Sequence, residues 1–138
     1  MTNTTQHIII IGGGPAGLEA ASSLGAAGYI VTVFEKEEQT GGKLRTWYKL
    51  FPDFRPSIQV QEYLANGQKM NPPEILTNAE VVSITPEIGH HKVVLTDGQI
   101  FKADSINIFI QLRYPAVFSR FNFRFCCINA YFCNFFTG

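Results

Sequence analysis

The chain has 138 residues, a length that suits one domain and is too short for a multidomain enzyme. It carries 11 lysines and arginines against 11 aspartates and glutamates, so its zero net charge argues against nucleic acid or an anionic membrane as a partner. Hydrophobic residues make up 46% of the sequence and charged residues 16%, which is enough apolar material for a buried core.

The first 34 residues predict a β-α-β unit. His7–Ile11 is a continuous β-branched run, which is typical of a parallel strand buried on both faces. Glycines 12–14 end this strand, and Pro15 suits the first turn of a helix that we expect over residues 16–27. A second β-branched run, Ile30–Phe34, completes the unit with a right-handed crossover.

The sequence beyond this unit predicts a mixture of helix and strand. We expect helices over residues 44–51 and 57–64, because Pro52 ends the first and Pro56 precedes the second. We expect strands over residues 81–84, 93–95, 100–103 and 106–110. Asp97-Gly98 favours a tight hairpin turn between the second and third of these strands, and the last one returns to the parallel sheet.

A dinucleotide-binding pattern, Gly12-x-Gly14-x-x-Gly17, lies between the first strand and its helix. Gly12 permits a tight turn, Gly14 leaves room for a pyrophosphate, and Gly17 allows close packing of the helix. The anion would sit on backbone N–H groups at the helix start. The expected binding residues here are Gly12, Gly14, Pro15, Ala16 and Gly17. The alternative is a glycine-rich turn without a ligand.

Glu35 ends the second strand, 18 residues beyond the last glycine of the pattern. Its carboxylate is placed to accept hydrogen bonds from the hydroxyls of an adenosine ribose, and its charge disfavours the 2′-phosphate of NADP. A solvated charge at the strand end is the alternative.

The loop after Glu35 separates two classes of dinucleotide protein. It reads Glu35-Lys36-Glu37-Glu38-Gln39-Thr40-Gly41-Gly42-Lys43-Leu44. With the preceding unit it resembles the N-terminal FAD-binding domain of the two-dinucleotide, pyridine nucleotide-disulfide oxidoreductase-like flavoproteins. In that group a Gly-Gly pair brings a second backbone segment near the FAD, so the resemblance implies cofactor contacts at Lys36, Gly41, Gly42 and Lys43. For Lys43, a solvated loop charge is equally compatible with the sequence.

The similarity continues to residue 108. The sequence after the Gly-Gly pair resembles heterodisulfide-reductase A-type and glutamate-synthase small-subunit-type proteins. Residues 75–84 match a strand whose backbone hydrogen-bonds the adenine ring in these proteins. The resemblance gives that role to Val81, or to Val82 if the register differs by one residue. A plain core strand without a ligand contact is the other alternative. The resemblance implies an α/β fold: a Rossmann-type FAD/NAD(P)-binding domain, whose parallel sheet carries a β-hairpin or meander insertion and is incomplete at the C-terminus.

The resemblance stops at residues 109–111. These flavoproteins continue with Ala-Thr-Gly, whereas this chain reads Phe-Ile-Gln. All three cysteines and seven of the twelve phenylalanines lie after residue 112, and the sequence after Asp104 carries a net charge of +3. We expect residues 1–111 to form a partial FAD-binding domain and residues 112–138 an unassigned tail, truncated or frameshifted, that favours self-association. A genuine short paralogue is the alternative.

The sequence predicts neither a metal site nor a catalytic acid, base or nucleophile. The cysteines lack C-x-x-C spacing, His90-His91 is interpreted as a solvated turn, and Trp47-Tyr48 as aromatic packing. We find no signal peptide and no membrane span, and expect a cytoplasmic protein.

The function implied by the resemblance is the FAD-binding portion of an NAD(P)H-dependent flavoprotein oxidoreductase. Complete relatives pass a hydride from NAD(P)H, their co-substrate, to FAD and then electrons to an acceptor, and the cofactor supplies that chemistry. The alternatives are an NAD-binding module that uses Glu35 and the glycine turn, or a non-catalytic remnant that interacts through its Phe-rich tail.

Overall fold

The computed structural model describes residues 5–50, 52–69, 71–109 and 133–134, with the side chains of the last pair left out. Its helices and strands follow in chain order: β1 His7–Ile11, α1 Pro15–Ala26, β2 Ile30–Phe34, the 3-10 helix η1 Gly42–Arg45, β3 Lys49–Leu50, β4 Arg55–Pro56, α2 Ser57–Gly67, β5 Glu74–Leu76, β6 Val81–Glu87, β7 His90–Leu95, β8 Ile100–Ala103, β9 Ser105–Ile108 and β10 Cys133–Asn134.

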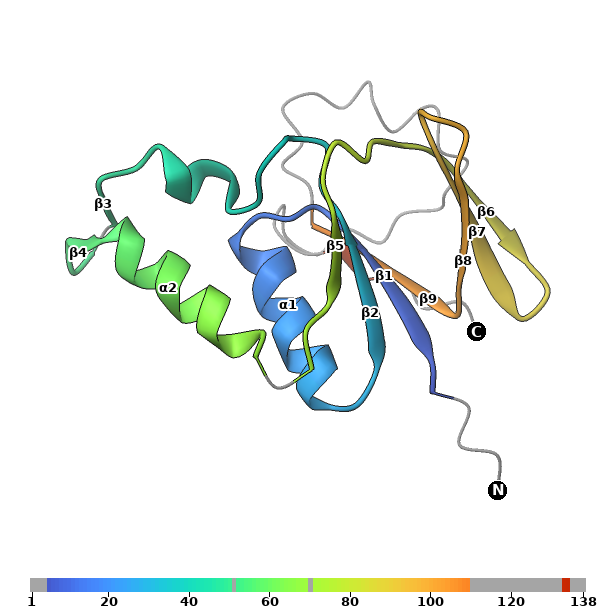
Figure 1. Cartoon of the computed structure of the whole chain (residues 1–138), viewed down its shortest axis with the longest axis horizontal. Coiled ribbons are helices and arrows are strands. Elements are labelled where there is room, and N and C mark those ends of the chain that lie inside the picture. Colours follow the sequence, from blue (N-terminus) through green and yellow to red (C-terminus); the bar gives the residue numbers. More distant parts are fainter. Residues whose placement is uncertain (1–4, 51, 70, 110–132, 135–138) are drawn as a thin grey trace.

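The main sheet has the strand order β10-β9-β1-β2-β5, in which four strands run parallel and β10 runs antiparallel to β9. The chain leaves β1 through α1 toward β2 and returns on the other side of β1 as β9 (Figure 1). The carboxyl ends of β1, β2 and β9 therefore lie together where the strand order reverses. In open α/β sheets ligands bind at such a point.

The two faces of the main sheet have different covers. The three-stranded antiparallel sheet β6-β7-β8 packs on one face, and α1 packs on the other (Figure 1). Ile9 faces the antiparallel sheet, whereas its neighbour Ile10 faces α1, as the alternation of side chains along a strand requires. Both isoleucines are fully buried, which explains why β1 has no polar residue between its ends.

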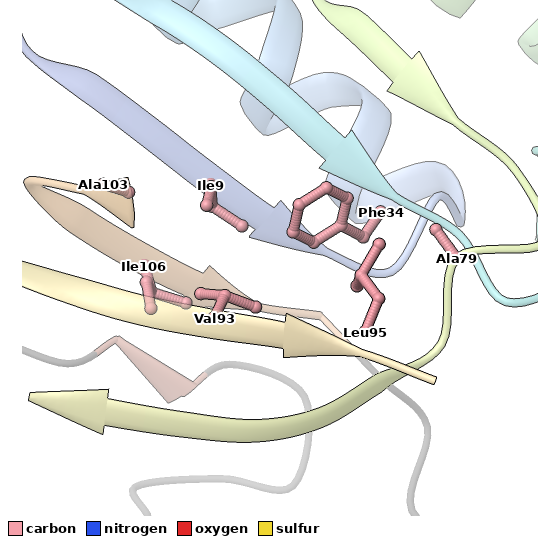
Figure 2. Packing of buried hydrophobic residues seen from close by; sticks show 7 residues of the cluster. All are labelled: Ile9, Phe34, Ala79, Val93, Leu95, Ala103 and Ile106. Carbon is pink, nitrogen blue, oxygen red and sulfur yellow. The ribbon is translucent and has the colours of Figure 1, made fainter. Parts of the chain in front are cut away.

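Seven buried residues fill the space between the two sheets: Ile9, Phe34, Ala79, Val93, Leu95, Ala103 and Ile106 (Figure 2). The Phe34 ring meets the ring of Phe101 edge-on, with 4.9 Å between centroids. Because Phe34 is the last residue of β2, this packing fixes the strand end that carries Glu35.

The second helix, α2, lies beside α1 (Figure 1). A smaller buried cluster joins them and includes Leu18 from α1, Leu64 from α2 and Leu44 from η1. The loop after β2 is thereby anchored to both helices.

The structure confirms most of the elements expected from the sequence. β1 and β2 have the predicted bounds, α1 begins one residue earlier than predicted, and α2 extends to Gly67. The predicted hairpin is β7-β8, in which Val93 faces Phe101. The returning strand ends at Ile108, although the N–H of Phe109 still donates to the carbonyl oxygen of Ile11 at 2.8 Å.

The helix predicted over residues 44–51 is wrong. A 3-10 turn ends at Arg45, and the short strand β3 pairs with β4, with Lys49 opposite Pro56. Ser57 supplies the tertiary reason, because its N–H donates to the Tyr48 carbonyl at 3.1 Å and its hydroxyl donates to the Trp47 carbonyl. These bonds occupy carbonyl groups that a helix would use.

His90 and His91 do not form the solvated turn that the sequence suggested. Both begin β7, where His91 pairs with Ala103 of β8, and both are half-buried. The turn falls one residue earlier, at Gly89, whose φ is +80°. Within the part of the chain that the structure describes, no helix has the length and hydropathy needed to cross a bilayer.

Candidate functional site

The glycine turn between β1 and α1 disfavours side chains at two positions, at Gly12 through its backbone conformation and at Gly17 through lack of space. Gly12 has a φ of +111°, which side chains disfavour, and its N–H donates to the carbonyl oxygen of Phe34 at 2.8 Å. A Cβ added to Gly17 would lie 1.9 Å from the carbonyl oxygen of Gly12. The helix thus starts directly against the turn.

Gly14 differs from these two glycines because it faces open space. Its φ is −74°, an ordinary value, and a Cβ added there would meet nothing within 4 Å. Gly14 is also the N-cap of α1, and its carbonyl accepts the Leu18 N–H at 2.9 Å. The first N–H groups of a helix have no intrahelical acceptor and carry the positive end of its dipole. The space at Gly14 therefore suits an anion.

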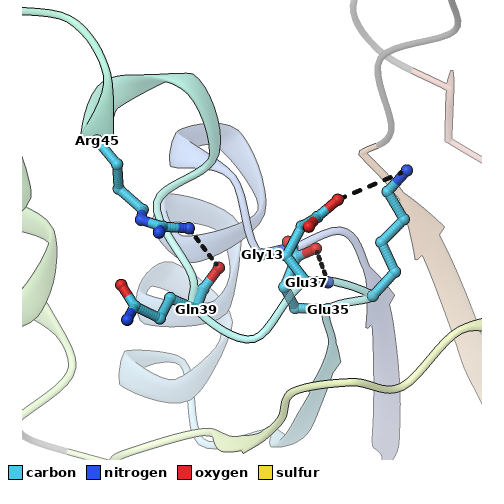
Figure 3. A network of polar contacts seen from close by, with 6 residues as sticks. Gly13, Glu35, Glu37, Gln39 and Arg45 are labelled. Atoms are coloured by element: carbon cyan, nitrogen blue, oxygen red, sulfur yellow. Dashed lines mark hydrogen bonds and ion pairs between the residues drawn. The ribbon is translucent and has the colours of Figure 1, made fainter.

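Glu35 lies directly beside this turn and is only 7% exposed. Its Oε2 accepts the N–H of Gly13 at 2.8 Å, and its Oε1 accepts the N–H of Glu37 at 2.9 Å (Figure 3). A carboxylate has about four lone-pair sites, so each oxygen keeps capacity for another donor such as a ribose hydroxyl. The two bonds orient the carboxylate before any ligand arrives.

Gly13 lies between two sequence-predicted glycines and makes contacts that the sequence did not indicate. A Cβ there would lie 3.0 Å from Glu35 Cβ and Oε2 and 3.0 Å from Thr40 Cγ2. The absence of a side chain thus allows both the carboxylate and the next loop to approach.

The predicted Gly-Gly segment lies against the glycine turn. The N–H of Gly41 donates to the carbonyl oxygen of Gly13 at 2.7 Å, and a Cβ on Gly42 would lie 3.4 Å from Gly14 Cα. Both residues have positive φ, +100° and +51° respectively, so the segment depends on glycine. The structure therefore forms a second backbone wall next to Gly14.

The two lysines predicted at the site lie at its exposed margin. Lys36 follows Glu35, and its Nζ lies 3.9 Å from Glu37 Oε1 in a pair with both side chains exposed. Lys43 is exposed in η1. Screened, exposed charges of this kind contribute little to folding and are available to a ligand.

Val81 begins β6 close to Glu35. The N–H of Ala79, two residues earlier, donates to the Glu35 carbonyl at 2.9 Å, and Val81 pairs with Leu95. The register shifts between Val81 and Ser83, which leaves Val82, 54% exposed, in a bulge. The start of β6 thus flanks Glu35.

A hollow of about 330 Å³ lies beside the Gly-Gly segment, between α1 and α2. Leu18, Ile58 and Leu64 give it an apolar lining, and Thr40, Gln61, Glu62 and Gln68 add polar groups. Sequence reasoning did not find this hollow, because it depends on how α2 packs. In the described part of the chain, no group of three or more potential metal-ligating side chains occurs.

The residues where the resemblance stops are described only in part. Phe109 extends the pairing of β9 with β1 and packs against the core on the α1 side of the sheet. Ile110, Gln111 and residues 112–132 lie outside the described residues, as do residues 135–138.

Comparison with known proteins places this geometry in a known group. Residues 10–66 match the family described as NAD(P)-binding Rossmann-like domain. A ferredoxin:CoB-CoM heterodisulfide reductase polypeptide from Methanosarcina mazei is 35% identical over 96 residues, which is 69% of this chain and 12% of that protein. The small chain of NADPH glutamate synthase from Mycobacterium tuberculosis is 55% identical over 42 residues, 30% of this chain and 9% of that protein. The chain is homologous to the nucleotide-binding portion of flavoprotein oxidoreductases.

This nucleotide-binding portion also has the expected fold. Thioredoxin reductase from Lactococcus lactis superimposes with a TM-score of 0.64 at 20% identity, covering 75% of this chain and 34% of that one. The predicted Rossmann-type α/β class is therefore confirmed, and so is the predicted resemblance to heterodisulfide-reductase A-type and glutamate-synthase small-subunit-type proteins. The chain spans about an eighth or less of the length of the curated relatives named above.

Proposed function

We propose that residues 1–111 bind FAD at the carboxyl edge of the parallel sheet and serve as the FAD-binding portion of an NAD(P)H-dependent oxidoreductase. The observation that carries this proposal is the open space at Gly14. There the start of α1, whose first N–H groups lack intrahelical acceptors, borders open space, and a neighbouring carboxylate is already oriented. The pyrophosphate occupies the helix start, with contacts from Pro15 and Ala16, and Glu35 binds the ribose hydroxyls.

The Gly-Gly segment supports FAD over NAD. An NAD site needs only the glycine turn and the acidic residue. Here a second backbone segment also contacts the turn, because the N–H of Gly41 donates to the carbonyl oxygen of Gly13 at 2.7 Å. In the proposed complex this segment is an additional wall along the dinucleotide. In this proposal Gly41 and Gly42, which lie against Gly13 and Gly14, line the pyrophosphate. Lys36 and Lys43 add positive charge at the exposed margin, and the Val81 backbone pairs with the adenine edge.

Substitution of Gly14 tests the site without testing the fold. Gly14→Val fills the open space with a branched side chain, and its backbone needs no positive φ. Ala26→Val, at the exposed far end of α1, adds similar bulk to the same helix away from the site. Titration of flavin fluorescence should show a large loss of FAD affinity for the first variant and none for the second. Equal FAD affinities of the two variants would show that the glycine turn is not part of the FAD site.

An NAD-binding module is the second candidate, because the matched family is described by its NAD(P) binding. Competition decides between the two functions. FAD bound to the purified chain should resist displacement by an equal concentration of NAD or NADP, and NADP should be the weakest competitor because Glu35 repels a 2′-phosphate. Displacement of FAD by NAD at equal concentration would establish the NAD-binding function instead.

The remaining proposals concern the setting of the protein. NAD(P)H serves as co-substrate only of the complete oxidoreductase, whose acceptor the site does not define. We propose a cytoplasmic location, and the zero net charge supports the absence of a nucleic-acid partner. Residues 112–138, with seven phenylalanines, favour self-association. Sedimentation of the whole chain over a concentration series tests this, and a monomer throughout would exclude it.

A further inference from the structure

The backbone around Glu35 is fixed from a second direction, by the end of β5 and the short segment that follows it. The Glu35 N–H donates to the Leu76 carbonyl at 2.9 Å, and the Ala79 N–H donates back to the Glu35 carbonyl at 2.9 Å. The N–H of Asn78 donates to the carbonyl oxygen of Glu37 at 3.0 Å. Residues 76–79 thus form hydrogen bonds with the backbone of both Glu35 and Glu37, although they lie some forty residues later in the chain.

Holding Glu37 matters for the Glu35 carboxylate itself. The N–H of Glu37 is the donor to Glu35 Oε1, so displacement of the Glu37 peptide would remove one of the two bonds that orient the carboxylate. The other bond comes from Gly13. Asn78 therefore acts on the carboxylate through one intervening residue, Glu37.

Asn78 can make this contact because of an unusual backbone conformation. Its φ is +53°, in the left-handed region, where asparagine is enriched and β-branched residues are outliers. The side chain is exposed, so the backbone conformation is the feature that the site uses. The left-handed turn brings the Asn78 N–H to Glu37, while the next residue, Ala79, enters the core between the two sheets.

We propose that Asn78 is a positioning residue for the ribose side of the nucleotide site, and that its left-handed backbone keeps the Glu35 carboxylate in its ligand-ready orientation. This inference rests on the proposed function for its effect on FAD. The orientation of the carboxylate is a property of the protein alone and can be measured without ligand.

Substitutions at Asn78 separate the backbone conformation from the side chain. Asn78→Val disfavours the left-handed conformation, whereas Asn78→Gly removes the same side chain and keeps that conformation accessible. Gly89→Val is the matched control for strain, because Gly89 has a φ of +80° with open space around it and lies in the β6–β7 turn, at the other end of β6.

Two measurements on the whole chain test the proposal. In Asn78→Val, amide hydrogen exchange at Gly13 and Glu37 should accelerate at least about tenfold, and the FAD dissociation constant should rise at least about tenfold. Asn78→Gly and Gly89→Val should change both by less than about threefold. Combined with Glu35→Ala, the Asn78→Val change should weaken FAD binding no further than Glu35→Ala alone.

The opposite results would overturn the proposal. These are unchanged exchange and affinity in Asn78→Val, an equal effect of Gly89→Val, or an additive loss in the double variant. If the wild-type chain binds no FAD, the proposed function fails, and the exchange measurement still decides the role of Asn78. If Asn78→Val does not fold, Asn78→Ala introduces a smaller strain at the same position and is judged by the same readouts.

Discussion

Gly17→Ala should destabilise the fold, because the space for its methyl group is already taken. The new Cβ would lie 1.9 Å from the carbonyl oxygen of Gly12, far inside any tolerated contact. Gly12 cannot easily retreat, since its N–H is bonded to Phe34 and its φ is already +111°. The start of α1 must move away from the turn instead.

The expected size of this effect follows from two opposing contributions. Severe overpacking costs about 3 kcal/mol, and replacement of a helical glycine by alanine returns about 1 kcal/mol. The net loss of about 2 kcal/mol corresponds to a melting temperature about 8 °C lower for a chain of this size. Thermal unfolding followed by circular dichroism measures it.

The matched control for this experiment is Gly14→Ala in the same turn. The same methyl group meets nothing within 4 Å there, and the backbone is ordinary. Its melting temperature should stay within about 3 °C of the wild type, since the change affects only the N-cap preference. Equal melting temperatures for Gly17→Ala and Gly14→Ala would refute the claim that the helix packs directly on the turn.

Three further predictions concern the ligand, the pH response and the activity. Glu35→Ala should weaken FAD binding by about 1–3 kcal/mol in a titration, and an unchanged affinity would exclude Glu35 from the site. In the exposed β3–β4 hairpin, the hydrogen bond from the Arg55 side chain holds the pKa of Asp53 below its usual 3.8. The small stabilisation from this pair is therefore present above pH 3.8 and lost as the pH falls through the lowered pKa, so urea midpoints of wild type and Asp53→Asn should converge in acid. Midpoints that differ equally at all pH values would contradict this assignment. The FAD-loaded chain should not be reduced by NADH or NADPH without oxygen, because the sequence holds one dinucleotide motif and hydride transfer needs both cofactors positioned. Rapid bleaching of the flavin band would reveal a second nucleotide site.

The part of the fold that the sequence predicted well is the part whose residues have one structural solution. A β-branched run such as His7–Ile11 is buried on both faces only in the middle of a covered sheet, and glycines at positions 12, 14 and 17 match a turn that starts a helix. The place of Glu35 at the end of the second strand could be predicted because it follows from the length of that β-α-β unit.

The rest of the fold and of the candidate site depends on tertiary contacts that no local sequence pattern encodes. Residues 46–50 form no helix because Ser57, which follows a hairpin, occupies the carbonyl groups of Trp47 and Tyr48. The role of Asn78 is invisible in sequence, since a polar residue between two strands is typical of any loop. Only its positive φ and its bond to Glu37 distinguish it.

The strand order has a consequence for how the protein is made. β1 pairs with β2, which follows it closely in the chain, and also with β9, so that the His7 N–H meets Asp104 across 97 residues. During synthesis the glycine turn, α1 and Glu35 leave the ribosome together. One edge of β1 stays unpaired until β9, which is made much later, becomes available. Contacts between distant residues slow folding, and an unpaired strand edge favours association with other chains. The main sheet therefore passes through an interval in which its central strand is paired on one side only, and association with other chains competes with folding during that interval.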